Sequence, residues 1–199
     1  MVFFIGLTGS IASGKSQAAS FFKTQNISVI NADDISKSLT APNTPALKAI
    51  ITHFGTSFLT STGELNRRAL RQHIMTHLEA RQWLEQYLHP LIRSEIEHQC
   101  QTVKSPYAIL EIPLLIDKKP YPYLNRVLLI ESEPEIQLKR IIKRDHCSME
   151  EAQALLAAQP NQALRRSIAD DIINNNGSLE QLQDQLIELD SRYQRLALD

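Results

Sequence analysis

Near its beginning the chain carries a glycine-rich segment that restricts strongly what the surrounding residues can form. Its eight residues fit the pattern G-x-x-x-x-G-K-[S/T] at every required position: Gly9-Ser10-Ile11-Ala12-Ser13-Gly14-Lys15-Ser16. Two glycines let the backbone bend so that successive N–H groups face inward. Lys15 then supplies a positive charge, and the Ser16 hydroxyl can hold Mg²⁺. The spacing therefore predicts a loop that binds the phosphates of a nucleoside triphosphate.

The residues on either side of this loop match the strand–loop–helix unit that the pattern requires. A short apolar, β-favouring run at 2–5 precedes it. After Lys15, four apolar residues fall on one side of a helical wheel, namely Ala18, Ala19, Phe21 and Phe22. The N-terminus of that helix would add its dipole to the anion site.

Composition restricts the class of protein further. The chain has 199 residues, of which 43% are hydrophobic and 22% charged, which suits one domain with a full core. A net charge of −1 is too small to attract the protein as a whole to nucleic acid or to a membrane surface. No apolar stretch approaches the roughly 18 residues of a membrane span, and no signal segment is visible. We therefore expect a cytoplasmic protein with neither nucleic-acid nor membrane partners. The oligomeric state is left open.

Beyond the first helix, short apolar runs alternate with stretches of helical pattern. Further strands are expected at 27–30, 107–112, 126–130 and 169–173. The runs at 107–112 and 126–130 are almost continuously apolar, which is typical of strands buried on both faces. Helix-start signals follow at Ser132 and Ser148. The pattern predicts an α/β fold, a parallel sheet flanked by helices.

The stretch from 46 to 103 is predicted to be largely helical. Two interruptions are expected within it, a Thr- and Ser-rich segment at 55–63 and the pair His89-Pro90, where the proline should kink or start a helix. The two cysteines, Cys100 and Cys147, lie far apart and have no metal-ligand spacing, so we expect buried or inert free thiols.

Other residues distinguish among proteins that share such a loop. A GTPase would carry D-x-x-G and N-K-x-D motifs, and neither occurs. The apolar strand that carries Glu111 is a poor match to the acidic strand of a motor or transport ATPase. The run Asn31-Ala32-Asp33-Asp34 ends the second strand, and ligands of α/β sheets bind beyond the carboxyl ends of strands. Alternation would place Asn31 and Asp33 on one side while the strand geometry lasts, and Asp33 could then accept a proton from an acceptor hydroxyl or orient that hydroxyl. The alternative is that Asp33 or Asp34 only caps the next helix.

Basic residues form a second clue. Lys139, Arg140, Lys143 and Arg144 lie within two helical turns, and the two arginines share a face at i,i+4 spacing. Arg165 and Arg166 follow about twenty residues later. Guanidinium groups can stabilise the charge of a transferring phosphoryl group, but a solvated helix surface accounts for such residues too.

Taken together, these segments resemble the dephospho-CoA kinase family, whose members phosphorylate the ribose 3′-hydroxyl of dephospho-CoA with ATP. The resemblance extends almost from end to end. The matching segments are Leu7–Ser16, Val29–Asp33, Gly63–Arg67, Leu88–Ile92, Ile112–Leu115, Gln137–Asp145 and Ala169–Ile173. The loop alone would not distinguish kinase families, whereas the ordered set is specific.

The resemblance implies an architecture and a set of site residues. It implies a P-loop NTPase core at about 1–40 and 105–199, a helical acceptor-binding subdomain at about 41–104, and a lid at about 134–166. Lys15, Asp33 and Arg140 would be catalytic. The loop from Gly9 to Ser16 would bind ATP with Mg²⁺, assisted by Arg144 and Asn175. The acceptor dephospho-CoA would contact Asp33, Arg67, His89 and Pro90.

Two departures from the family pattern carry consequences. Asn31 stands where the family usually has Asp, which weakens any metal role there, because an amide offers an oxygen without charge. Asn174 likewise replaces an Asp in the turn where adenine contacts are implied. Two alternatives remain open: a kinase for another small acceptor, and a nucleotide-dependent binding module.

The last segment repeats apolar residues at alternating steps of three and four. They are Leu179, Leu182, Leu186, Leu189, Tyr193 and Leu196. We expect this stripe to pack on the chain's own sheet, since the repeat is short for a coiled coil.

Overall fold

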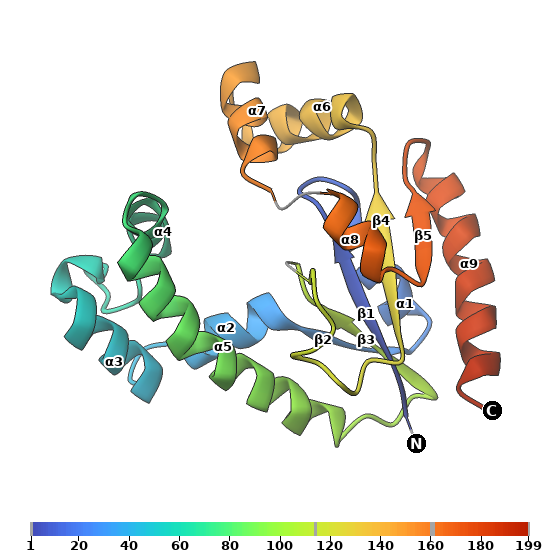
Figure 1. The fold of residues 1–199 in the computed structure, drawn as a ribbon, viewed down its shortest axis with the longest axis horizontal. Coiled ribbons are helices and arrows are strands. Elements are labelled where there is room, and N and C mark those ends of the chain that lie inside the picture. Colours follow the sequence, from blue (N-terminus) through green and yellow to red (C-terminus); the bar gives the residue numbers. More distant parts are fainter. Residues whose placement is uncertain (1, 114, 160–161, 199) are drawn as a thin grey trace. The chain divides into compact units, whose positions relative to one another are not determined.

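The computed structural model describes residues 2–113, 115–159 and 162–198, so Leu114 of the Ile112–Leu115 segment lies outside the described residues. The chain divides into two compact units. One takes in the residues up to Asn31 and again those from Thr102 onward, and the other is Ala32–Gln101. Figure 1 labels the helices and strands of both.

The first unit is built on a parallel sheet. Its strands are β1 (Phe3–Gly9), β2 (Ser28–Asn31), β3 (Tyr107–Glu111), β4 (Arg126–Glu131) and β5 (Asp171–Asn174). Among the described residues they form one five-stranded sheet in the order β2-β3-β1-β4-β5, with every neighbouring pair parallel. β1 is central, and the chain turns to opposite sides of it for β3 and β4. The predicted parallel sheet is confirmed, and the glycine-rich segment follows the carboxyl end of β1, the side on which open α/β sheets generally bind ligands.

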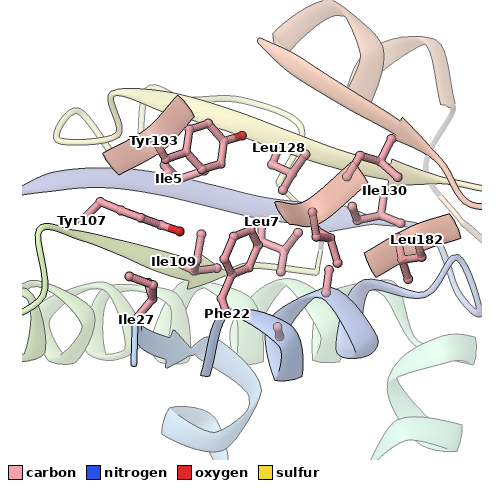
Figure 2. Close-up of a cluster of buried hydrophobic side chains, with 14 residues drawn as sticks. Ile5, Leu7, Phe22, Ile27, Tyr107, Ile109, Leu128, Ile130, Leu182 and Tyr193 are labelled. Carbon is pink, nitrogen blue, oxygen red and sulfur yellow. The ribbon is translucent and has the colours of Figure 1, made fainter. Parts of the chain in front are cut away.

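Helices cover this sheet. They are α1 (Lys15–Thr24), α6 (Pro134–Asp145), α7 (Met149–Ala157), α8 (Gln162–Ile168) and α9 (Leu179–Leu196). Helices α1 and α9 contact each other and bury one face of the sheet. Figure 2 shows Phe22 of α1 and Leu182 and Tyr193 of α9 among strand side chains such as Leu7 and Leu128. The strand residues of this cluster alternate along each strand, as a pleated strand requires when one face meets these helices.

Two buried tyrosines reach carboxylates at the edge of this core. The Tyr107 hydroxyl donates to Asp190, and the Tyr193 hydroxyl donates to Asp171 Oδ2 at 2.9 Å. Burial, helped by these carboxylates, raises the pKa of both phenols. The tyrosines therefore stay neutral and act as donors, so the polar ends of large buried rings are satisfied.

Across the sheet from this cluster, the backbone of β1 meets the loop that joins β3 to β4. A Cβ added at Gly6 would lie 2.8 Å from Leu115 Cδ2 and 3.1 Å from Leu124 Cδ1. Both leucines are buried. The loop therefore packs tightly on the second face of β1, which explains why β1 is buried on both sides.

The second unit is helical. It contains α2 (Ala32–Leu39), α3 (Pro45–Phe54), a short 3₁₀ turn (Thr56–Phe58), α4 (Arg67–Thr76) and α5 (Leu78–Cys100). Its core comprises Ile50, Leu70 and Leu84, with aromatic rings packed around them. Trp83 stacks on His53 at 3.8 Å between ring centroids. Side chains from three helices thus form a small independent core.

Two local features differ from what the sequence suggested. Helix α5 does not start at Pro90 but continues through it, and a break separates α4 from α5 at His77, whose backbone is extended. Helix α2 begins at Ala32, directly after β2, so strand alternation does not relate Asn31 to Asp33.

The apolar stripe near the end of the chain forms α9 and packs on the sheet, as predicted. Leu182, Leu186 and Tyr193 are fully buried, while Leu179 remains 54% exposed. No helix among the described residues combines the length and apolar character needed to cross a membrane.

Candidate functional site

The glycine-rich segment forms a loop between β1, which ends at Gly9, and α1, which begins at Lys15. Two of its residues are left-handed: Ala12 has φ 57° and Gly14 has φ 101°. Left-handed residues alternating with right-handed ones turn successive amides toward one side, which makes a concave anion site. A non-glycine residue held in this region is strained, as is common where a backbone serves a ligand. The predicted strand–loop–helix context is confirmed.

Both glycines of the pattern are needed because other atoms occupy the space of a side chain. A Cβ at Gly9 would lie 2.6 Å from the Ile130 carbonyl oxygen and 2.6 Å from Ser13 Oγ. A Cβ at Gly14 would lie 2.1 Å from Asn175 Nδ2. The loop is therefore pressed against the carboxyl end of β4 and against the turn after β5.

Side chains from distant segments hold the loop carbonyls. Gln137 Nε2 donates to the Ile11 carbonyl at 2.9 Å, and Arg140 Nη1 donates to the Ala12 carbonyl at 3.3 Å. Asn175 Nδ2 donates to the Ser13 carbonyl at 2.8 Å. Three successive carbonyls are thus held by protein donors, which fixes the curvature of the loop and the direction of its amides.

The N-terminus of α1 can bind a negatively charged group. Gly14 caps the helix without any side-chain hydrogen bond, and the first turn holds no acidic residue. Unpaired N–H groups at a helix N-terminus, together with the dipole, favour an anion. Ser16 is exposed on this first turn, so its hydroxyl is accessible beside the loop.

Lys15 makes an ion pair that sequence reasoning missed. Its Nζ lies 2.7 Å from Glu111 Oε1, with side chains only 14% and 6% exposed. Asn31 Nδ2 donates to the other oxygen, Glu111 Oε2, at 2.6 Å. The signal was available, because Glu111 ends an otherwise apolar strand.

The two arginines of α6 differ in their surroundings. The Arg140 guanidinium faces the loop: besides the Ala12 carbonyl it reaches Ser132 Oγ at 2.9 Å and the Asn175 carbonyl at 3.1 Å. Burial lowers its pKa from the usual value. Arg144 instead pairs with the neighbouring Asp145 at 2.7 Å, and its side chain is 56% exposed. The structure therefore brings Arg140 to the loop and leaves Arg144 on a solvent-exposed ion pair.

A cavity of about 230 Å³ lies beside the loop in the same unit. It is lined by Ser10, Leu129, Ile130, Glu131, Ser132, Pro134, Gln137, Leu156, Gln159, Gln162 and Arg165. Glu131 is 5% exposed, and its carboxylate accepts hydrogen bonds from Arg166 at 2.7 Å and Gln162 at 2.9 Å. Burial opposes ionisation, but these donors hold the pKa of Glu131 below its usual value. One side of the cavity is therefore the ionised carboxylate of Glu131, whose negative charge is compensated by Arg166.

The remaining predicted residues belong to the second unit. Asp33 lies in the first turn of α2, where a negative charge also stabilises the helix dipole. Arg67 begins α4, and its Nη2 donates to Thr40 Oγ1 at 2.8 Å and to the Lys37 carbonyl at 3.2 Å. His89 and Pro90 line an open groove of about 500 Å³ on α5.

Comparison with known proteins gives consistent results. A family model described as Dephospho-CoA kinase matches residues 3–181. The dephospho-CoA kinase of Legionella pneumophila strain Paris is 48% identical over 99% of this chain and 98% of its own. That of Escherichia coli K12 is 42% identical over 99% and 96%. The solved dephospho-CoA kinase of Campylobacter jejuni superimposes with a TM-score of 0.71 at 28% identity, covering 98% of each chain.

Proposed function

We propose that this chain, because it belongs to the dephospho-CoA kinase family, transfers the terminal phosphoryl group of ATP to the ribose 3′-hydroxyl of dephospho-CoA. The products are CoA and ADP. The observation that carries this proposal is the loop from Gly9 to Ser16, whose carbonyls are held from outside by Gln137, Arg140 and Asn175. Such a fixed nest of amides is suited to polyphosphate.

In this reaction the bond between the γ-phosphorus and the bridging oxygen of ATP breaks, and a bond to the 3′-oxygen forms. The acceptor hydroxyl loses its proton in the process. Because the transition state is loose, positioning and charge matter more than base strength. Lys15 would neutralise charge on the β- and γ-phosphates. Arg140, whose guanidinium already lies against the loop, would add positive potential there.

Mg²⁺ is proposed to arrive with ATP. At phosphate sites Mg²⁺ takes few protein oxygens and completes its shell with phosphate oxygens and water. The exposed Ser16 hydroxyl on the first turn of α1 fits that need. When bound, the cation supplies charge neutralisation across the two terminal phosphates. Among the described residues, the hydroxyl of Ser16 is the group that we assign to it.

Asp33 is proposed to orient the acceptor hydroxyl. The competing explanation, that it only stabilises the start of α2, applies equally to Asp34 in the same turn. Asp34 is paired with Lys37 at 2.8 Å on the surface. Asp34→Asn is therefore a matched control for Asp33→Asn. If Asp33 orients the hydroxyl, only Asp33→Asn loses most of its kcat. Equal turnover of the two variants would refute the role.

The helical unit is proposed to bind dephospho-CoA through Arg67, His89 and Pro90, with residues at about 134–166 acting as a lid over the phosphates. An alanine at His89 should raise the KM for dephospho-CoA and leave the KM for ATP unchanged. A lid that excludes water should keep ATP hydrolysis slow when no acceptor is present. Hydrolysis as fast as transfer would contradict the lid.

The decisive experiment for the activity is an assay of ADP release with purified protein, ATP, Mg²⁺ and dephospho-CoA. A panel of other acceptors, including a nucleoside monophosphate and shikimate, tests acceptor specificity. We expect rapid release with dephospho-CoA alone, and a loss on the order of 10²–10³-fold for Lys15→Ala. Turnover only with another acceptor would refute the proposal. Absence of turnover with every acceptor, together with ATP-dependent association with a partner, would favour a binding module.

A further inference from the structure

The carboxyl ends of β2 and β3 bring Asn31 and Glu111 together. The two residues are directly opposed in the sheet register, and the neighbouring strand β1 leads into the phosphate loop. Glu111 is 5% exposed, so its carboxylate depends on protein donors. Each of its oxygens has one: Asn31 Nδ2 at 2.6 Å and Lys15 Nζ at 2.7 Å.

This arrangement contains one negative and one positive charge. The negative charge belongs to Glu111 and the positive charge to Lys15, while Asn31 contributes a neutral donor. Desolvation offsets much of the attraction within a buried ion pair, but removing one partner leaves the other as an uncompensated buried charge at a large electrostatic cost. The lysine required for ATP is therefore engaged before any nucleotide is present.

An incoming polyphosphate must compete for that lysine. If Lys15 turns to the β- and γ-phosphates, Glu111 loses its counter-ion. If Lys15 stays between them, phosphate and carboxylate charges come within several ångströms of each other. In either case the negative charge of Glu111 opposes nucleotide binding.

We propose that Glu111 is an internal counter-ion that competes with ATP for Lys15, and that Asn31 limits this competing charge to a single unit. The proposal rests on the assignment of the Gly9–Ser16 loop to ATP. Its functional consequence is a moderated affinity, since the site never presents an uncompensated lysine. Glu111 is thus a residue that tunes affinity through Lys15 and does not itself contact the reacting atoms.

The same geometry explains why an amide suits position 31. The Asn31 nitrogen approaches Glu111 at hydrogen-bonding distance, 2.6 Å. A carboxylate in its place would have no proton to donate at neutral pH, and two negative oxygens would be in contact. The pair would then carry a second negative charge beside Lys15 and would weaken ATP binding further.

The test is equilibrium binding of ATP without Mg²⁺, by calorimetry, to three variants and the wild-type protein. Glu111→Gln keeps the shape and removes the charge, and the Asn31 amide can turn to present its oxygen to the new nitrogen. We expect Glu111→Gln to bind ATP about tenfold more tightly, the order expected for one charge near a phosphate in a partly screened site. Asn31→Asp should bind about tenfold more weakly on the same basis.

The double variant Asn31→Asp/Glu111→Gln restores one carboxylate and one amide in exchanged places. It should return the Kd for ATP to near the wild-type value, which a purely structural role for either residue would not produce. AMP, which lacks the β- and γ-phosphates, should bind all variants alike. Asp171→Asn is the matched control, because Asp171 is a buried, arginine-paired carboxylate at the opposite edge of the same sheet.

Unchanged or weaker ATP binding by folded Glu111→Gln would overturn the proposal. So would a loss confined to ATP with Mg²⁺, which would make Glu111 a metal ligand. Circular dichroism verifies folding. If Glu111→Gln proves unfolded, Glu111→Ala carries the same prediction of tighter ATP binding, and Asn31→Asp carries the opposite one. Failure of the wild-type protein to bind ATP at all would instead contradict the proposed function, so the two failures are distinguishable.

Discussion

Substituting alanine for Gly14 probes the fit between the phosphate loop and the turn after β5. The new Cβ would lie 2.1 Å from Asn175 Nδ2, so the Asn175 side chain must retreat by more than about 1 Å to reach ordinary contact distance. That movement breaks its 2.8 Å hydrogen bond to the Ser13 carbonyl, at a site where Asn175 is only 6% exposed. Gly14 also has φ 101°, which an alanine adopts only with strain.

These two effects have separate magnitudes. An alanine at positive φ costs about 1 kcal/mol relative to glycine. The broken hydrogen bond costs about 1–3 kcal/mol more, because the buried Asn175 amide loses its acceptor and the Ser13 carbonyl keeps only the longer, 3.2 Å bond from the Ser132 hydroxyl. We therefore expect Gly14→Ala to reduce the free energy of unfolding by about 2–4 kcal/mol and to weaken ATP binding at least about tenfold.

Gly63 supplies the matched control. It too has positive φ, 79°, but an added Cβ would meet nothing within 4 Å. Gly63→Ala should therefore show only the backbone cost of about 1 kcal/mol, with unchanged ATP affinity. Urea unfolding followed by circular dichroism, with titration of ATP, measures both quantities. Equal destabilisation by the two variants, or full ATP affinity in Gly14→Ala, would refute this reasoning.

Three further predictions concern single side chains. Gln137→Ala should raise the Kd for ATP several-fold, because the Ile11 carbonyl loses its 2.9 Å donor; unchanged binding in a calorimetric titration would show that the loop keeps its shape unaided. Burial raises the pKa of Cys100 to about 11, so in a Cys147→Ser background this thiol should react with a disulfide reagent at pH 8 about two orders of magnitude more slowly than after denaturation. Because the pKa of Glu131 is held below its usual value, its contribution to stability is present above about pH 4 and is lost as pH falls through the folded pKa. Glu131→Gln should flatten that acid limb in pH-dependent urea unfolding, and an identical limb in both proteins would contradict the assignment.

Much of the fold follows from short-range patterns in the chain. The apolar runs at 107–112 and 126–130 correspond to β3 and β4. They could be recognised because a strand that is buried on both faces is apolar at almost every position. Ser148 forms the expected capping box with Glu151 at the start of α7. Local patterns fail at His77, where α4 ends and α5 begins without a strong breaker or a side-chain cap.

The phosphate loop could be identified by spacing alone, since its function depends on backbone geometry that eight consecutive residues specify. The residues that contact the loop could not be identified from the sequence. The donors that hold its carbonyls, Gln137, Arg140 and Asn175, lie more than 120 positions away along the chain. Likewise the pairing of Lys15 with Glu111 exists because β3 lies beside β1. Sequence periodicity reports which side chains are buried, but strand order alone determines which of them meet, and that order is set by the packing of the whole unit.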